Sequence, residues 1–205
     1  MSYNSPGNRF QRITPVVLNL IIINGLVFIA QMVLDKSIDL TDMLALYPYD
    51  SGQFKPYQLV THMFAHAGFM HILFNMYGLW MFGTVLERSW GPRRFLIFYF
   101  VCGLAAGIAQ CLLVHNAAAI GASGAVMGLL GAFGYLFPNT QFFIIPFPFP
   151  IKAKYMVAII AAIDIFGGFH PGGADNIAHF AHLGGLVMGL VLVIIWNKTN
   201  KKTFY

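Results

Sequence analysis

Six apolar stretches, separated by more polar segments, dominate the pattern of hydrophobic and polar positions along the chain. They cover residues 16–34, 68–86, 95–114, 123–137, 155–170 and 177–196. An α-helix rises about 1.5 Å per residue, so a helix that crosses a membrane core about 30 Å thick needs about 20 residues. The fourth and fifth stretches are shorter than this, and the other four have the required length. The pattern predicts an all-α, polytopic membrane protein with six transmembrane helices, of which the fourth is short and starts below the membrane surface.

The composition favours a membrane protein over a soluble one. Hydrophobic residues make up 58% of the 205 residues and charged residues only 9%, whereas a soluble domain has about 25% charged residues. A disordered chain would need low hydrophobicity and high net charge. The two cysteines, Cys102 and Cys111, lie nine positions apart in one predicted helix. They therefore face opposite sides of that helix and cannot form a disulfide with each other.

Positive charge collects on one side of the predicted bundle. Ten of the 12 lysines and arginines fall there: Arg9, Arg12, Arg88, Arg93, Arg94, Lys152, Lys154, Lys198, Lys201 and Lys202. The other side holds Lys36, Lys55, Asp35, Asp39, Asp42, Asp50 and Asp175. By the positive-inside rule both termini lie in the cytoplasm, which predicts a short cytoplasmic tail over 1–15, a membrane domain over 16–196 and a basic cytoplasmic tail over 197–205. This placement accounts for the net charge of +5 without a nucleic-acid partner.

Two segments outside the predicted helices carry many aromatic residues. Residues 35–67 are too long for a tight turn and mix aromatic with polar residues, which predicts a segment in the outer membrane interface. Residues 138–150 contain four prolines, which exclude a continuous helix, so we expect a cytoplasmic interfacial loop. The first apolar stretch is followed by no cleavage motif, and we expect a retained helix rather than a signal peptide.

A polar group within an apolar stretch is costly and marks a candidate functional site, and six such residues stand out. They are His71, Asn75, Ser123, Asp164, His179 and His182.

Ser123 opens the short fourth helix. A helix over 123–137 is about 22 Å long, so its first residue lies about 8 Å below the outer boundary if its last residue reaches the cytoplasmic one. The preceding loop then enters the membrane, which is tolerated where its backbone is buried in protein or lines a watery cavity. A serine at this place either caps the helix or holds its oxygen at the positive end of the helix dipole, where a developing anion is favoured.

His182 lies at the same expected depth. It follows the outer end of the sixth helix by about five residues, or about 8 Å. Glycines line both helices: Gly184, Gly185 and Gly189 on the sixth, and Gly124, Gly128, Gly131 and Gly134 on the fourth. Close packing of these faces would bring Ser123 and His182 within reach of each other. The alternative is a neutral histidine that is hydrogen-bonded to a neighbouring helix, and His179, one turn nearer water, is expected at the interface.

His71 and Asn75 are spaced i, i+4 and share one face of the second helix. Both can donate hydrogen bonds, and polar pairs of this kind also join helices in membranes. His62, His66 and His71 could suggest a metal, but no cysteine or cluster of carboxylates supports such a site. We therefore expect no metal.

Together these segments resemble the rhomboid family of intramembrane serine proteases. The matching runs are GASG at 121–124, HLGGLVMG at 182–189 and HILFN at 71–75, which are similar to the family's GxSG, HxxGxxxG and HxxxN motifs. Weaker matches are Glu87 with Arg88 and the run DIFG at 164–167. The motifs occur in the family's order, and the resemblance covers about residues 15–196.

The resemblance implies a role for each of these residues. Ser123 would be the nucleophile and His182 the general base, while the backbone N–H of Ser123, His71 and Asn75 would form the oxyanion site. His66 would have a structural or hydrating role at most, and no cofactor is implied.

The chain departs from the family pattern at two places. Tyr57 and Gln58 stand where the family often has Trp-Arg, which removes a charge from the first loop. Met127 stands where some members place a tyrosine that stacks on the histidine.

The sequence places no carboxylate where it could orient His182. Asp175 lies seven residues earlier, and Asp164 belongs to another helix. We therefore expect a Ser–His dyad in which packing from the fourth helix orients the imidazole ring.

The resemblance also implies the substrates and the membrane. The substrates would be transmembrane segments of other proteins in the lipid bilayer, cleaved near the outer face after the fifth helix moves aside. The short tails indicate a prokaryotic cytoplasmic (inner) membrane. Two other functions stay open: a non-catalytic binder or escort of membrane proteins, and a small transporter or haem carrier that uses His62, His66, His71 and His182.

Overall fold

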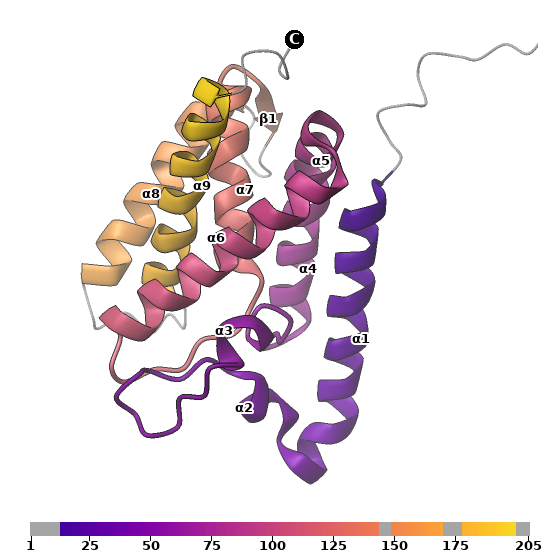
Figure 1. Cartoon of the computed structure of the whole chain (residues 1–205), viewed down its shortest axis with the longest axis vertical. Coiled ribbons are helices and arrows are strands. Elements are labelled where there is room, and N and C mark those ends of the chain that lie inside the picture. The colour runs from indigo at the N-terminus through magenta and orange to yellow at the C-terminus, as the bar shows by residue number, and fades with distance from the viewer. Residues whose placement is uncertain (1–12, 144–148, 170–177, 200–205) are drawn as a thin grey trace, which may run out of the picture.

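The computed structural model describes residues 13–143, 149–169 and 178–199 of the chain, and these form a bundle that is mostly helical (Figure 1). Its elements are α1 Pro15–Ile38, α2 Leu40–Leu44, α3 Gln58–Thr61, α4 Phe69–Gly78, η2 Leu79–Gly83, α5 Thr84–Trp90, α6 Pro92–Leu113, α7 Ser123–Leu136, β1 Gln141–Phe143, β2 Pro150–Lys152, α8 Ala153–Phe169 and α9 His179–Thr199. Residues 1–12 and 200–205, which make up most of the predicted tails, and residues 170–177, which include Asp175, lie outside the described residues.

Four helices of the described chain are long and apolar enough to cross a membrane. They are α1, the continuous helix Phe69–Trp90, α6 and α9. The helices α7 and α8 are shorter, with 14 and 17 residues, as their apolar stretches predict. The chain is therefore an integral membrane protein with several spanning helices.

The second predicted helix contains a π-helical turn that its sequence does not predict. α4, η2 and α5 follow one another without a break, and Leu79–Gly83 forms the π-helix between them. Phe82 in this turn is buried against Phe133 of α7, with ring centroids 5.3 Å apart. π-helical turns inside α-helices are rare and often occur near functional sites.

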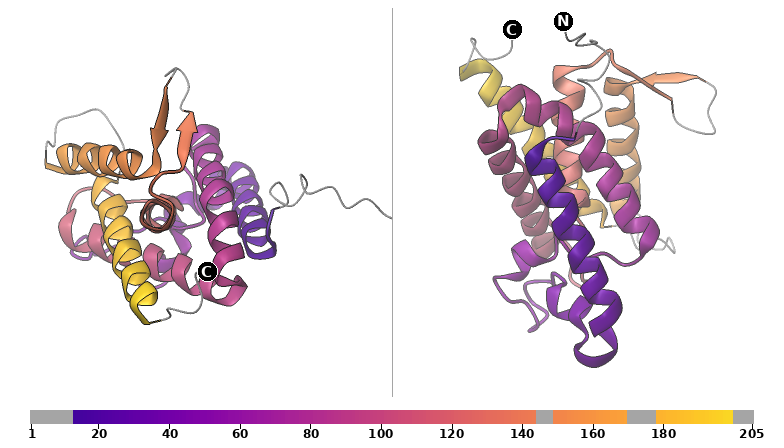
Figure 2. Two further views of the ribbon diagram at one scale, coloured as in Figure 1. Left: turned by 90° about the horizontal axis from the view of Figure 1, so that it is seen from above. Right: turned by 90° about the vertical axis from the view of Figure 1, so that its right-hand side faces the viewer.

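α7 lies at the centre of the bundle, where it packs against α6, α8 and α9 (Figure 2). The predicted glycine faces of α7 and α9 meet. A Cβ on Gly185 would lie 1.9 Å from the carbonyl oxygen of Gly124, and one on Gly189 would lie 2.4 Å from that of Gly128. The close approach of these two helices is thus confirmed, because only glycine fits at these two positions.

Two other glycines face different helices from those predicted. A Cβ on Gly184 would meet Ala109 of α6 at 2.6 Å, and one on Gly134 would meet Val157 of α8 at 2.5 Å. Adjacent positions on a helix point about 100° apart, so Gly184 and Gly185 cannot serve the same neighbour.

The proline-rich segment after α7 was expected to be a loop outside the helices, and within it the structure adds a short antiparallel sheet to the all-α fold that was predicted. Gln141 pairs with Lys152, and Phe142 with Ile151. Phe142 packs edge-on against Phe82, which holds the sheet on the end of the bundle. The prolines do prevent a helix, but they leave the two flanking runs free to pair with each other.

A buried glutamate joins α1 to α5. Glu87 is 3% exposed, and its carboxylate accepts hydrogen bonds from the hydroxyl of Thr14 and from the backbone N–H groups of Val16 and Val17. Thr14 is the N-cap residue of α1 and its own side chain caps nothing within that helix. Glu87 therefore caps the first turn of α1 from a neighbouring helix.

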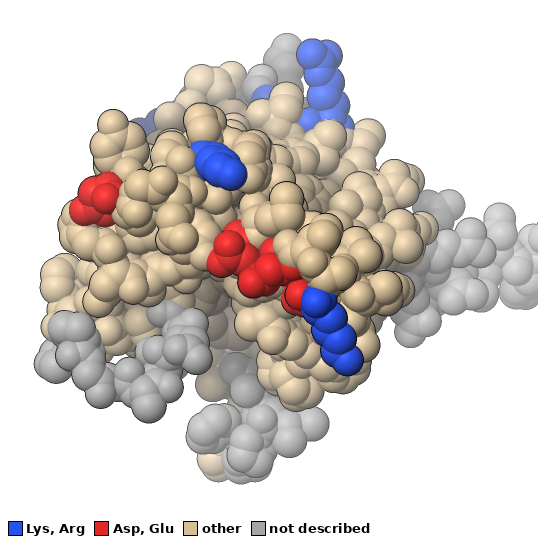
Figure 3. Space-filling model, turned by 90° about the horizontal axis from the view of Figure 1, so that it is seen from below, with Lys and Arg blue, Asp and Glu red and all other residues tan. Residues whose placement is uncertain are grey.

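Opposite charges collect at opposite ends of the bundle. α1 begins and α9 ends at one end, which carries Arg88, Arg93, Arg94, Lys152, Lys154 and Lys198. The other end is seen from below in Figure 3, where carboxylates gather around the end of α1 and α2. This division of charge within the described residues follows the one in the sequence.

Candidate active site

Ser123 and His182 are hydrogen-bonded to each other. The distance from Ser123 Oγ to His182 Nε2 is 2.8 Å. Ser123 is the first residue of α7, and the N-cap is Ala122, with no side-chain hydrogen bond to the helix. The alternative in which Ser123 only caps its helix is therefore wrong, because its hydroxyl points to the imidazole of α9.

Backbone hydrogen bonds hold the loop before Ser123 inside the acidic end of the bundle. Ala119 forms two bonds with Leu46, each of 2.9 Å, and the N–H of Gly121 donates to the carbonyl oxygen of His62 at 2.8 Å. Gly121 has φ +125°, a conformation that favours glycine. Gly121 and Ala122 are buried in protein, as the predicted entry of this loop into the membrane requires.

His182 lies in the first turn of α9, and its side chain is 13% exposed. The contact between Gly185 and Gly124 one turn further on brings the two helix starts together. The equal depth that the sequence predicts for Ser123 and His182 is therefore realised as a direct contact.

A carboxylate contacts the second ring nitrogen of His182, so the prediction that no carboxylate could orient this ring is wrong. Asp164 Oδ1 is 3.0 Å from His182 Nδ1 and 2.8 Å from His179 Nδ1. Asp164 is on α8, and packing of α8 against α9 brings its mid-helix position to the first turn of α9. The sequence could not show where α8 crosses α9, because the spacing of residues along the chain does not determine how two helices pack.

His179 is buried rather than exposed at the membrane interface, contrary to expectation. Its side chain is 6% exposed, and its ring lies against α8 at Gly167, where a Cβ would come within 2.2 Å of Nε2. The run DIFG at 164–167 thus serves both histidines: Asp164 bonds to them, and Gly167 leaves room for one of the rings.

The three side chains Ser123, His182 and Asp164 form a line with defined donor and acceptor roles. If Nδ1 of His182 donates to the carboxylate, Nε2 is left with a lone pair directed at the serine hydroxyl. A neutral imidazole of this tautomer can accept the hydroxyl proton. The buried carboxylate also stabilises the imidazolium that this transfer creates.

His71 lies beside the loop that precedes Ser123. A Cβ on Gly121 would be 2.8 Å from Nε2 of His71. Nδ1 of the same ring accepts a hydrogen bond from the backbone N–H of Ala67 at 3.2 Å. In the neutral ring Nε2 then carries the hydrogen, so a donor faces the start of α7.

Asn75 is buried one turn further along α4, 5% exposed. Its amide group donates to the carbonyl oxygen of His71 at 2.9 Å, and its Oδ1 has no hydrogen-bond partner among the described residues. The amide has a second N–H, which is free to donate elsewhere.

The remaining histidines of the predicted set lie near the same loop. His62 Nδ1 is 2.8 Å from the carbonyl oxygen of Gln58, and the His66 ring packs edge-on against His71 with centroids 5.1 Å apart. Burial lowers the pKa of His62 to about 4, and burial together with the nearby His71 lowers the pKa of His66 to about 4. Within the described part of the chain, no three histidine, cysteine or acidic side chains converge as metal ligands do.

Gln31 of α1 supports this region and was not singled out from the sequence. Its amide accepts from the N–H of His66 at 3.0 Å and donates to the carbonyl oxygen of the same residue at 3.2 Å. A polar residue near the outer end of an otherwise apolar helix is the signal that could have marked it. Asp164 carried the same signal, together with two histidines spaced i, i+3 that needed a common partner.

The fold and the site define a class of protein: a helical integral membrane protein with a serine and a histidine hydrogen-bonded inside the bundle, at the start of a short central helix. The Rhomboid domain family matches residues 53–198. The chain belongs to the rhomboid family.

Curated relatives include a bacterial rhomboid protease and mitochondrial proteins named rhomboid or rhomboid-like. The chain is 36% identical over 134 residues to the rhomboid protease GluP of Bacillus subtilis, which covers 65% of this chain and 24% of that protein. It is 34% identical over 140 residues to the mitochondrial RHOMBOID-like protein 6 of Arabidopsis thaliana, covering 68% of this chain and 43% of that protein. The mitochondrial rhomboid protein 1 of Saccharomyces cerevisiae is 33% identical over 141 residues, which cover 65% of this chain and 40% of that protein. The chain thus spans less than half the length of these three relatives.

Proposed function

We propose that this protein is an intramembrane serine endopeptidase that cleaves transmembrane segments of other membrane proteins. The observation that carries this proposal is the 2.8 Å contact between Ser123 Oγ and His182 Nε2 at the positive end of α7. Ser123 is the nucleophile and His182 the general base. Asp164 is a positioning residue that holds the ring of His182, a role that the dyad expected from the sequence did not include.

The proposed reaction has two stages. His182 Nε2 takes the hydroxyl proton while Ser123 Oγ attacks the peptide carbonyl carbon, and the imidazolium then returns the proton to the leaving amine. This breaks the peptide bond and leaves an acyl group on Ser123. A water molecule, deprotonated by His182, attacks the acyl carbon, and its proton passes to Ser123 Oγ as the acid product leaves.

The oxyanion of each stage forms beside the start of α7. The first N–H groups of a helix have no intrahelical partner, so the N–H of Ser123 is available to donate. His71 presents Nε2 next to Gly121, and Asn75 has a second amide hydrogen on the same face of α4. These three donors form the proposed oxyanion site.

The substrate helix enters from the bilayer between α8 and α4. α8 packs on α7 and α9, and its residues Ile163, Phe166 and Phe169 are exposed on the surface that would face lipid. Lateral movement of α8 would carry Asp164 with it, so opening and alignment of His182 are linked. A covalent crosslink between α8 and α4 that leaves cleavage intact would contradict this route.

The proposed orientation of the protein in the membrane rests on the different charges of the two ends of the bundle. The basic end lies in the cytoplasm, so that both termini are cytoplasmic, and the cleavage site is near the outer face. Similarity to both bacterial and mitochondrial relatives supports a membrane of bacterial descent.

Reconstitution in vesicles with a transmembrane substrate tests this proposal. Wild-type protein is expected to cleave the substrate, while Ser123→Ala and His182→Ala each abolish detectable cleavage. Ser89→Ala and His115→Asn are matched controls, because Ser89 bonds only within its own helix and His115 pairs with Asp50 at the surface. Binding of the substrate by wild type without cleavage would favour the non-catalytic escort function instead.

A further inference from the structure

His179 has no part in the reaction proposed above, although it is bonded to a residue that does. Its Nδ1 lies 2.8 Å from Asp164 Oδ1, the same oxygen atom that lies 3.0 Å from His182 Nδ1. An ionised carboxylate can only accept hydrogen bonds, so Nδ1 of each ring carries a hydrogen. The two histidines stand at i, i+3 at the start of α9 and thus share one carboxylate oxygen of α8.

Two donors on one oxygen atom restrict the rotation of the Asp164 carboxylate. A hydrogen bond to an ionised acceptor is roughly twice as strong as one between neutral groups. With His182 as its only partner, the carboxylate would be free to turn about its last side-chain bond, whose preferred angles are broad. The bond from His179 removes this freedom, so Oδ1 stays in line with His182 and Ser123.

The ring of His179 is itself held in place by α8. A Cβ on Gly167 would lie 2.2 Å from Nε2 of this ring and 2.4 Å from its Cε1. Gly167 follows Asp164 by three positions, so both residues lie on one face of α8. That face supplies the acceptor together with the space for one imidazole ring, which fixes the position of His179 relative to Asp164.

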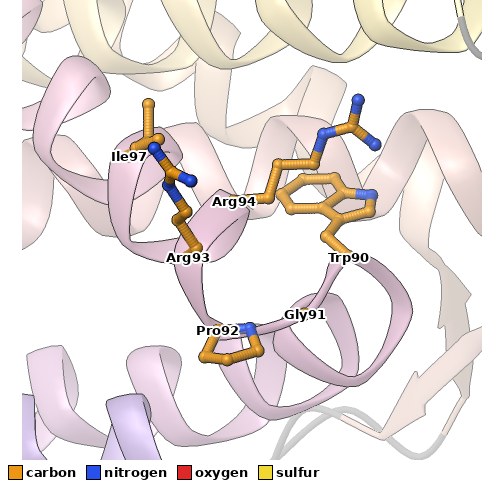
Figure 4. Close-up of a pocket in the computed structure, with 6 residues that line it drawn as sticks. All are labelled: Trp90, Gly91, Pro92, Arg93, Arg94 and Ile97. Atoms are coloured by element: carbon orange, nitrogen blue, oxygen red, sulfur yellow. The ribbon is translucent and has the colours of Figure 1, made fainter.

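α9 is anchored in the bundle by contacts other than this bond. Its glycine face packs on α7 near its start. At its other end, Trp196 packs edge-on against Trp90 of α5, with ring centroids 5.5 Å apart. Arg94 of α6 lies 5.0 Å from the centroid of the Trp196 ring, at the wall of a cavity of about 390 Å³ that Trp90 also lines (Figure 4). The bond from His179 therefore acts on Asp164 rather than on the placement of α9.

We propose that His179 is a second positioning residue, which acts on His182 through Asp164. This inference rests on the proposed protease function. His179 fixes the direction of the carboxylate, the carboxylate keeps the hydrogen of His182 on Nδ1, and Nε2 is left as the base that faces Ser123. His179 itself moves no proton and touches no substrate.

Variants of His179 separate its hydrogen bond from its shape. His179→Phe keeps a ring beside Gly167 but offers no donor, so it should lower kcat about 10–100-fold with little change in KM, as expected for the loss of a hydrogen bond to a charged group. His179→Asn offers an amide N–H near the position of Nδ1 and should recover most of this loss. A normal kcat in His179→Phe, or equal losses in the two variants, would overturn the proposal.

Two further variants complete this set. His115→Phe is the matched control, because His115 also contacts a carboxylate through Nδ1, but at the surface, and it should cleave as wild type does. His179→Leu is a second donor-free variant for the case in which the phenylalanine ring does not fit beside Gly167 and the protein does not fold. It should show the same loss of kcat.

A double variant tests whether His179 acts through Asp164. In protein that already carries Asp164→Asn, the addition of His179→Phe should not lower kcat further, because the residue on which His179 acts has already been changed. Fluorophosphonate labelling of Ser123 gives the same comparison where cleavage is slow. Effects that multiply, as those of independent sites do, would overturn the assignment.

A spectroscopic readout that needs no cleavage keeps this inference apart from the protease proposal. In the full chain with isotope-labelled histidine, the nitrogen NMR shifts show which ring nitrogen of His182 carries the hydrogen, and loss of its signals in His182→Asn identifies them. Wild type should have the hydrogen on Nδ1, and His179→Phe should show both tautomers. An unchanged tautomer in His179→Phe would overturn the inference, whereas the expected shift in a protein that cleaves nothing would contradict the protease proposal alone.

Discussion

Asp164 Oδ1 lies 3.0 Å from Nδ1 of His182, on the side of the imidazole opposite to Ser123. Replacement by asparagine keeps the shape but offers an amide that can hold the wrong tautomer, so we expect Asp164→Asn to lower kcat on the order of 10²–10⁴-fold with little change in KM. The rate at which a fluorophosphonate labels Ser123 should fall in parallel.

The control for this variant is Asp50→Asn, since Asp50 also pairs with a histidine, but at the surface. It should cleave as wild type does. Normal turnover by Asp164→Asn would show that packing alone orients His182, as the sequence suggested.

Asn75 tests the oxyanion site. We expect Asn75→Ala to lower kcat about 10²–10³-fold, because one donor to the developing oxyanion is lost. Its effect on the thermal unfolding temperature should be small, since among the described residues its side chain bonds only to its own helix. A variant that unfolds without a specific loss of kcat would support the alternative in which this residue joins helices.

Gly185→Ala should disturb the contact of α7 with α9. The added methyl would lie 1.9 Å from the carbonyl oxygen of Gly124, so the helices must separate, at a cost of about 1–3 kcal/mol. Both stability and cleavage should fall, because the Ser123–His182 contact lies one turn away. The matched control is Gly25→Ala in α1, where nothing lies within 4 Å of the new methyl and neither property should drop.

Glu87→Ala should destabilise the fold without acting on the chemistry. It removes the acceptor of three buried or half-buried hydrogen bonds at the start of α1, which is worth about 1–3 kcal/mol. Thermal unfolding in detergent measures the effect. kcat of the folded fraction should match wild type, and Ser89→Ala, two positions away, should leave the unfolding temperature as it is.

The two buried histidines of the outer segment predict a loss of stability in acid. The pKa of His62 and that of His66 fall to about 4 in the fold because of burial, against about 6.5 in the unfolded chain. The unfolded state therefore binds more protons between these values. Stability should be greatest above pH 6.5 and decline toward pH 4, by up to about 1.4 kcal/mol per pH unit for each histidine.

Thermal unfolding measured across this pH range checks the expected decline. His115→Asn removes an exposed histidine and should leave the profile unchanged. A wild-type profile that is flat from pH 7 to pH 4 would contradict neutral burial of the two rings.

Much of the fold followed from the period and length of apolar runs, which depend on local chemistry. The start of α7 at Ser123 and the close packing of the glycine faces of Gly185 and Gly124 were both predicted, because the length of a helix and the spacing of its glycines can be counted along a single segment of the sequence. The π-helical turn at Leu79–Gly83 was not, since its apolar residues fit an α-helix equally well. The pairing of Gln141 with Lys152 was missed because prolines show where a helix stops but not what replaces it.

The site was predicted less completely because it depends on how helices cross. Depth along the membrane normal placed Ser123 and His182 at one level, and this needed only helix lengths. The contact of Asp164 with His182 depends on the direction in which α8 passes α9, which no spacing within either helix encodes. The signal in the sequence was Asp164 itself, since a carboxylate in an apolar helix is costly unless it has a cationic or hydrogen-bonding partner.

The bonds that join Ala119 to Leu46 and Gly121 to His62 tie the loop before Ser123 to the segment between α1 and α4, which lies outside the spanning helices. That outer segment is in turn clamped to α1 through Gln31 and His66. The depth of the Ser123 hydroxyl is therefore set by contacts with other parts of the protein and not by the thickness of the surrounding lipid. In the proposed protease, a thinner or thicker bilayer would change which peptide bond of a substrate helix lies beside Ser123, while the contact between Ser123 and His182 would stay as it is.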